Sequence, residues 1–142
     1  AAAYPKRASV NLKFDAVLAQ KIYAGCDIFL MPSRFEPCGL GQMICLRYGT
    51  IPVVRRTGGL SDTIREYDRV TGEGNGFVFT EYLSSKLLSA VKRALDLYKD
   101  KAAWTELMKK AMACDFSWED SARQYMQLYK RLARSETGCR VR

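Results

Sequence analysis

The sequence predicts an α/β fold built on a parallel sheet of about four strands, with helices on both faces and a helical C-terminal end. Over residues 9–80, short apolar runs bounded by turn residues alternate with segments whose apolar residues recur at helical spacing. From Ser84 onward only the helical spacing remains. Strands that alternate with helices are joined by right-handed crossovers, and such connections make the strands parallel.

The first part of the chain is expected to hold two strands and two helices. Residues 9–14 (SVNLKF) alternate and predict a strand, after which Asp15 can cap a helix that ends at Gly25. Residues 27–31 (DIFLM) form a continuous apolar run, as expected of a strand buried on both faces. Residues 39–48 predict a helix that the following glycine closes.

The second part begins with strands and ends in helices. Residues 51–56 and 77–80 predict strands, with a short helix over 62–68 and a loop over 70–76 between them. Three helices follow, the last over residues 117–134. The apolar residues that define one face of each helix are, in turn, Leu87, Leu88, Val91, Leu95 and Tyr98; Trp104, Leu107, Met108 and Ala111; and Tyr125, Met126, Tyr129 and Leu132.

Composition excludes several classes of function. The chain of 142 residues carries 23 Lys and Arg against 15 Asp and Glu, a net charge of +8. Because basic and acidic residues are interspersed, we expect a solvated surface or attraction of a small anionic ligand, and no nucleic-acid binding. No run approaches the ~20 apolar residues of a membrane span, so we expect no membrane contact.

Cysteine and histidine usage bears on chemistry and compartment. The five cysteines form no Cys-x-x-Cys pair, and the chain has no histidine. These features argue against metal ligation and against Cys-His or Ser-His catalysis within the chain. Irregularly spaced, odd-numbered cysteines suit reduced thiols, so we expect an intracellular protein without a metal or another cofactor.

Two glycine-rich corners follow predicted strands. Residues 32–40 follow the second strand and residues 55–60 follow the third. In parallel α/β sheets, ligands bind beyond the carboxyl ends of the strands. We therefore expect the two corners to face one common crevice.

The residue types at the corners indicate a phosphorylated, polyhydroxylated ligand such as a nucleotide sugar. Gly58 and Gly59 allow close backbone approach before a helix start, where N–H groups favour phosphate, although a plain tight turn is an alternative. Glu36 can accept hydrogen bonds from sugar hydroxyls; its alternatives are a surface acid or a helix cap. Cys38-Gly39-Leu40 begins a helix whose first N–H groups point toward the same crevice.

The string PSRFEPCGLGQM (residues 32–43) followed by RYGTIPVVRRTGGLSDT (residues 47–63) closely resembles the bacterial glycogen synthase and plant starch synthase family. The resemblance extends from about Val10 to Leu132. It implies a retaining glucosyltransferase of two Rossmann-like lobes (the GT-B fold) that transfers glucose from ADP-glucose to the non-reducing end of an α-1,4-glucan. UDP-glucose is a donor that the sequence leaves open.

The resemblance also assigns roles to residues. Glu36 matches the family's essential glutamate, which contacts the donor glucose near the reacting centre. The turn beside that sugar matches Cys38, Gly39 and Leu40, and the loop that holds the distal phosphate through backbone N–H groups matches Thr57, Gly58, Gly59 and Leu60. Phe14 falls where the family places an aromatic ring against adenine; a core Phe at a strand end is the alternative. The second acid of the wider two-glutamate motif is replaced by Ile44, in agreement with this branch.

Much of the family's architecture is absent from the chain. Residues 1–142 match only the later part of the second, nucleotide-sugar-binding lobe, and the helix over 117–134 matches the one that packs back toward the N-terminal lobe. In the doubly wound strand order 3-2-1-4-5-6, two absent strands belong between residues 9–14 and 27–31. Either these two strands pair directly, or exposed sheet edges find a partner chain, or the chain is a fragment; we favour a fragment, inactive alone.

The resemblance places the whole protein in a bacterial cytoplasm or a plastid stroma. The expected partners are a nucleotide sugar, an α-1,4-glucan and the N-terminal lobe of the same protein. A non-catalytic module that binds a nucleotide or a glucan is the competing hypothesis. The sequence leaves the oligomeric state and the role of Cys38 open.

Overall fold

The computed structural model of the chain describes the backbone of residues 4–136 and the side chains of residues 4–133. The elements in chain order are α1 (Ala16–Gly25), β1 (Ile28–Met31), α2 (Gly41–Tyr48), β2 (Ile51–Arg55), α3 (Gly59–Thr63), β3 (Phe77–Phe79), α4 (Ser84–Tyr98), α5 (Lys101–Met112) and α6 (Trp118–Glu136). This order confirms the predicted alternation of strands and helices followed by a helical end.

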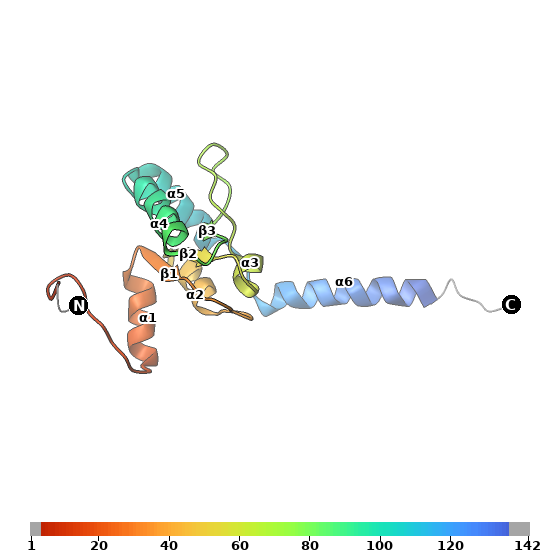
Figure 1. The fold of residues 1–142 in the computed structure, drawn as a ribbon. Coiled ribbons are helices and arrows are strands. Elements are labelled where there is room, and N and C mark those ends of the chain that lie inside the picture. The colour runs from red at the N-terminus through yellow and green to blue at the C-terminus, as the bar shows by residue number, and fades with distance from the viewer. Residues whose placement is uncertain (1–3, 137–142) are drawn as a thin grey trace.

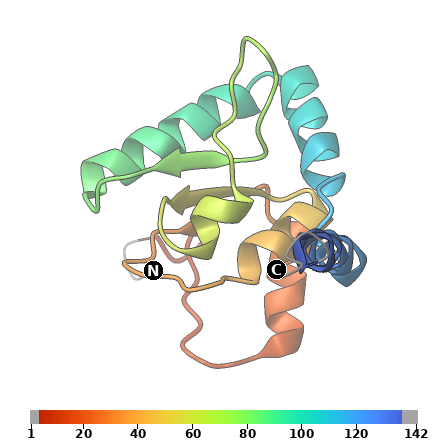
Figure 2. The same ribbon diagram turned by 90° about the vertical axis from the view of Figure 1, so that its right-hand side faces the viewer.

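The sheet is parallel, with the strand order β1-β2-β3. Ile28 is opposite Ile51, and Val53 is opposite Phe77. Helix α4 lies on one side of the sheet, and α2 and α3 lie on the other (Figure 1). Figure 2 shows β2 and β3 pointing the same way, so their carboxyl ends meet at one end of the sheet. The prediction of a parallel sheet with helices on both faces is confirmed.

The core lies around the central strand. Residues 51–54 of β2 and all of β3 are buried. The α4 and α5 residues that complete the core are Ala90, Ala94, Leu97, Trp104, Leu107 and Ala111. Of the predicted faces, Leu87 and Val91 pack at the core margin, whereas Leu88 and Leu95 are about half exposed. The buried stripe of α4 is therefore rotated toward small residues, which let the helix approach the sheet closely.

The described residues form three strands, and the prediction of a strand over residues 9–14 is wrong. Those residues have no ladder partner, and Leu12 and Phe14 are 95% and 97% exposed. A strand needs a hydrogen-bonded neighbour, and this segment has none among the described residues. In the expected doubly wound order, two further strands would lie between it and β1. Direct pairing of residues 9–14 with β1 does not occur.

Helix α3 differs from the short helix predicted over residues 62–68. It begins at Gly59 and ends at Thr63. Beyond it, Glu66 pairs with Gly76 in an isolated bridge, and the Tyr67 N–H donates to the Gly76 carbonyl at 2.8 Å. Pairing with a distant segment therefore overrides a local helical pattern.

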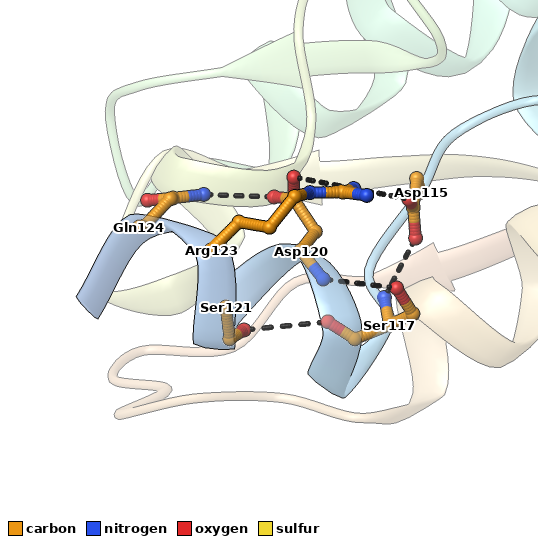
Figure 3. A network of polar contacts seen from close by, with 6 residues as sticks. All are labelled: Asp115, Ser117, Asp120, Ser121, Arg123 and Gln124. Carbon is orange, nitrogen blue, oxygen red and sulfur yellow. Dashed lines mark hydrogen bonds and ion pairs between the residues drawn. The ribbon is translucent and has the colours of Figure 1, made fainter. Parts of the chain in front are cut away.

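Helix α6 extends away from the rest of the molecule (Figure 1). Its N-terminus is capped by Ser117, whose Oγ accepts from the Asp120 N–H at 3.2 Å. The Ser117 N–H donates to Asp115 at 2.9 Å, and Arg123 bridges Asp115 and Asp120 (Figure 3). The predicted stripe of Tyr125, Met126, Tyr129 and Leu132 is 53–62% exposed, so the alternative that it packs on this sheet is wrong.

Candidate functional site

The two glycine-rich corners meet, as the sequence analysis expects. The Gly59 N–H donates to the carbonyls of Glu36 at 3.1 Å and Pro37 at 3.2 Å. A Cβ added to Gly58 would lie 1.9 Å from the Glu36 carbonyl oxygen, and one added to Gly59 would lie 2.0 Å from that of Cys38. Both glycines are therefore required for the close approach of the two backbones.

We call residues 33–40 the Glu36 loop. Arg55, at the end of β2, ties its first half to the sheet. The Arg55 Nε donates to the Ser33 carbonyl at 2.8 Å, and one terminal nitrogen donates to the Arg34 carbonyl. The other terminal nitrogen lies 3.4 Å from the Thr80 carbonyl, and the guanidinium carbon lies 5.5 Å from the centre of the Tyr82 ring. One cation thus joins the loop to the end of β3.

Gln42, in the first turn of α2, holds the second half of the loop. Its side chain is fully buried. The Gln42 Nε2 donates to the carbonyls of Gly39 at 2.8 Å and Cys38 at 3.2 Å, and to the Thr63 hydroxyl at 3.1 Å. The Thr63 hydroxyl in turn donates to the Gly59 carbonyl at 2.8 Å. A continuous hydrogen-bond path thus connects the two corners.

These contacts fix which way the peptide groups of the loop face. The carbonyls of residues 33, 34 and 36–39 all accept hydrogen bonds from β2, α2 or α3. All peptide bonds of the described chain are trans, so each N–H points opposite to the preceding carbonyl. The amides of Cys38, Gly39 and Leu40 therefore face away from the packed interior, and within residues 4–136 none has a protein acceptor.

Glu36 lies beside these amides. Its side chain is partly exposed, and its Oε2 accepts a 3.4 Å hydrogen bond from the Ser33 hydroxyl. Among the described residues it forms no ion pair. The alternative of a helix cap is wrong, because the N-cap of α2 is Leu40 and no side chain caps this helix. The carboxylate is available to a ligand.

The second corner offers fewer free donors than the sequence predicts. The Leu60 N–H donates to the Thr57 carbonyl at 3.1 Å, and the Gly59 N–H is engaged by the Glu36 loop. Within the described residues, the amides of Thr57 and Gly58 have no protein acceptor. Of the four residues expected to donate backbone N–H groups to phosphate, two therefore serve packing and two remain available.

Phe14 is 97% exposed in the structure, so the alternative that it is a core residue is wrong. The expectation that it contacts a nucleobase stays a prediction.

Sequence reasoning missed Gln42, Thr63 and the role of Arg55. A signal for Gln42 was present, because it shares the buried face of α2 with Cys45 and Leu46. A polar residue at a core-facing helical position needs a hydrogen-bonding partner. The partners of Arg55 and Thr63 come from other elements, and no local pattern points to them.

Comparison with known proteins agrees with this geometry. The family model "Glycosyl transferases group 1" matches residues 12–111. The chain belongs to this family. Among solved structures, this glycosyltransferase chain is similar to the catalytic domain of starch synthase IV from Arabidopsis thaliana bound to ADP and acarbose. The TM-score is 0.76 at 47% identity over 84% of this chain and 25% of that one. The sucrose-phosphate synthase of Thermosynechococcus elongatus has a TM-score of 0.61 at 25% identity, over 87% of this chain and 29% of its own.

Curated relatives of this glycosyltransferase chain include two bacterial proteins named glycogen synthase. That of Fervidobacterium nodosum is 61% identical over 90% of this chain and 26% of its own length. That of Thermosipho melanesiensis is 63% identical over 90% of this chain and 27% of its own length. The chain thus spans about a quarter of the relatives that it matches.

Two further findings concern the described residues alone. No helix between residues 4 and 136 is both long and apolar enough to span a membrane. The same residues contain no cluster of three or more His, Cys, Asp or Glu side chains that could hold a metal ion.

Proposed function

We propose that the chain forms the nucleotide-sugar side of an enzyme that transfers glucose, with retention of configuration, to the non-reducing end of an α-1,4-glucan. The family, the relatives named glycogen synthase and the starch synthase neighbour support this proposal. The observation that carries it is the Glu36 carboxylate beside three outward-facing amides at the carboxyl end of β1. ADP-glucose is the proposed donor, because the starch synthase neighbour is described as bound to ADP.

The chemistry follows from the polarity of these groups. A carboxylate accepts hydrogen bonds from sugar hydroxyls, and its negative charge stabilises the positive charge that develops on the glucosyl group as the diphosphate leaves. The amides of Cys38, Gly39 and Leu40 donate to sugar or phosphate oxygens without loss of an internal hydrogen bond. Their carbonyls are already held, so binding needs little reorganisation of the loop.

The second corner contributes to phosphate binding in this proposal. The free amides of Thr57 and Gly58, with the Thr57 hydroxyl, approach the distal phosphate. Gly59 and Leu60 support them by packing, since Leu60 is fully buried. Phe14 would stack against the base once the absent strands order its segment.

The rest of the enzyme would lie outside this chain. The exposed apolar face of α6 would pack against the N-terminal lobe. The Arg and Lys that neutralise the diphosphate would come from the first strand and loop of the second lobe, which lie outside this chain. The absence of a metal from the reaction, and a location in the bacterial cytoplasm or plastid stroma, stay predictions. The second candidate is a module that binds a nucleotide or a glucan through the same carboxylate and amides without transfer.

The test is a chimera in which this chain replaces the matching segment of the Fervidobacterium nodosum protein. We expect glucose transfer from ADP-glucose to a glucan. Glu36→Gln keeps the shape of the side chain and removes its charge, so kcat should fall about 100-fold or more. Glu106→Gln, an exposed carboxylate on α5, is the matched control and should leave kcat unchanged.

Calorimetric titration of the isolated chain with ADP and ADP-glucose separates the two candidates. If the chain binds ligand while the well-folded chimera transfers no glucose, the binding module is the better description. Equal kcat values for Glu36→Gln and Glu106→Gln would overturn the proposed role of Glu36.

A further inference from the structure

Gln42 is a buried amide at a position where the neighbouring residues of α2 are apolar. It is 0% exposed and shares its helix face with Cys45 and Leu46. Burying an amide is unfavourable unless its polar atoms find partners. A polar side chain retained at this position therefore needs a reason other than packing.

The two ends of this amide are used unequally. The Nε2 group has three acceptors within 3.2 Å, whereas the buried Oε1 has no hydrogen-bond partner among the described residues. In the reverse orientation, Oε1 would face the carbonyl oxygens of Cys38 and Gly39, and the contact would be repulsive. The site thus requires a donor at this point and tolerates an unsatisfied acceptor to have it.

Gly39 and Gln42 fit against each other. Gly39 has a φ of +71°, and a Cβ on it would come within 2.5 Å of the Gln42 Oε1. With glycine there, the Gln42 amide reaches both adjacent carbonyls. These two hydrogen bonds turn the N–H groups of Gly39 and Leu40 toward the outside.

The same amide also connects the loop to the second corner. Gln42 donates to the Thr63 hydroxyl, which donates to the Gly59 carbonyl, while the Gly59 N–H donates back to the carbonyls of Glu36 and Pro37. The two corners are therefore held in one closed set of hydrogen bonds. A change at Gln42 affects the orientation of both.

We propose that Gln42 is a positioning residue of the donor site, which acts through Thr63 and through the carbonyls of Cys38 and Gly39 to aim the amides of Gly39 and Leu40 at the donor ligand. This role rests on the proposed function for its consequence in catalysis. Its structural part, the orientation of two peptide groups, does not.

The first test is the crystal structure of the 142-residue chain carrying Gln42→Met. Methionine has a similar length and volume, fills the buried space and donates no hydrogen bond. We expect the peptide groups 38–39 and 39–40 to turn so that at least one carbonyl reaches solvent. Unchanged orientation of both carbonyls would overturn the proposal.

Thr63→Val provides a second route if the Gln42 variant does not fold. It removes the hydroxyl that connects Gln42 to Gly59, whereas Thr63→Ser keeps it. We expect displacement of the loop in Thr63→Val and none in Thr63→Ser. The same displacement in both variants, or in neither, contradicts the proposed path.

The second test measures kinetics in the chimera described above. We expect Gln42→Met to lower kcat/KM for the sugar nucleotide by about 10- to 100-fold, with kcat falling more than KM rises. The thermal midpoint should change little, because methionine also removes the unsatisfied acceptor. Gln20→Met, an exposed glutamine of α1, is the control for the composition change.

A purely structural role gives the opposite combination. In that case the thermal midpoint falls while the folded enzyme keeps its kcat and KM, and the proposal fails. If the unmutated chimera transfers no glucose, the proposed function fails instead, and the peptide orientation in the crystal structures alone decides the role of Gln42.

Discussion

The two edges of the sheet differ sharply in how well they are covered. All three residues of β3 are buried beneath α4. In β1, Leu30 is 46% exposed, and the adjacent α1 contains no buried residue. Both strands are edge strands within the described residues, yet β3 is buried along its whole length whereas β1 is open to solvent at Leu30.

This difference fits the proposed assignment of the chain to the later part of a doubly wound lobe. In that assignment β1, β2 and β3 correspond to strands 4, 5 and 6, so β3 would be an edge strand and β1 an interior strand. The Glu36 loop nevertheless follows β1. It is held from the covered side, by Arg55, Gly59 and Gln42, so its geometry does not depend on the open edge.

The largest expected effect on stability comes from truncating a buried leucine, in comparison with a leucine on the open edge of the sheet. Leu107→Ala, at a fully buried position of α5, should lower the free energy of unfolding by about 2–5 kcal/mol, because it leaves a buried cavity. Leu30→Ala, on the open edge, should cost about 1 kcal/mol or less, since the side chain is already half in solvent. Urea unfolding of both variants measures the difference; equal costs would mean that the open edge is covered in solution.

The next prediction concerns the backbone contact between the corners. Gly59→Ala should cost about 3 kcal/mol, because its Cβ meets the Cys38 carbonyl at 2.0 Å and the backbone must move. In Gly25→Ala the new Cβ meets nothing within 4 Å, so stability should be unchanged or slightly higher. The unfolding midpoints of the two variants measure the difference in stability. An unchanged midpoint for Gly59→Ala would show that the two corners can separate without loss of stability.

A smaller effect on stability is expected from Arg55, whose guanidinium connects the Glu36 loop to the end of β3. Arg55→Lys should lower stability by about 1–2 kcal/mol, because an ammonium cannot bond to the carbonyls of Ser33, Arg34 and Thr80 together. Arg56→Lys changes an exposed neighbour in the same way and should be neutral. The affinity for ADP, measured by calorimetry, should fall only for the Arg55 variant. An equal loss of affinity in both variants would contradict the role of Arg55 in holding the Glu36 loop.

The last comparison concerns the reactivity of two thiols and requires no mutation. Cys38 is exposed in the Glu36 loop, whereas Cys45 is buried in α2. Burial, with the nearby Cys26, raises the pKa of Cys45 from 9.0 to about 12, so its thiol stays protonated at pH 8 in the folded chain. Alkylation followed by mass spectrometry should modify Cys38 and spare Cys45 until urea is added.

The same shift in the pKa of Cys45 sets a dependence of stability on pH. The folded pKa lies above the unfolded one, so this contribution to stability is complete below pH 9.0 and is lost as the pH rises toward about 12. In the alkylation experiment, labelling of Cys45 in the folded chain at pH 8 would contradict the burial of its thiol.

The sequence predicted the elements whose cause is local. The apolar run of β1, the end of α2 at Gly49 with a φ of +80° and the Asp15 cap of α1 all occur in the structure. The prediction of a strand over residues 9–14 was wrong because a strand also needs neighbours. The predicted extent of the helix over 62–68 was wrong because residues 65–67 pair with the loop around residues 75–76.

The site was predicted in part for the same reason. Motifs placed Glu36 and the two glycine corners at one end of the sheet, where the structure brings them together. The donors that set the loop, Arg55 and Gln42, reach it across the fold. Such contacts depend on tertiary packing, which no window of sequence contains.

The outward-facing groups of the Glu36 loop are backbone amides, and this has a consequence for how the site can vary. The side chains of Phe35 and Leu40 are 72% and 67% exposed, so substitution there removes little buried packing. Substitutions at these two positions can therefore alter the charge and bulk of the surface around the loop while the backbone amides keep their orientation. Under the proposed function, the side chains around the loop would set ligand selectivity while the backbone amides bind the donor. A side chain at Gly39, Gly58 or Gly59 would clash with neighbouring atoms and disturb these amides.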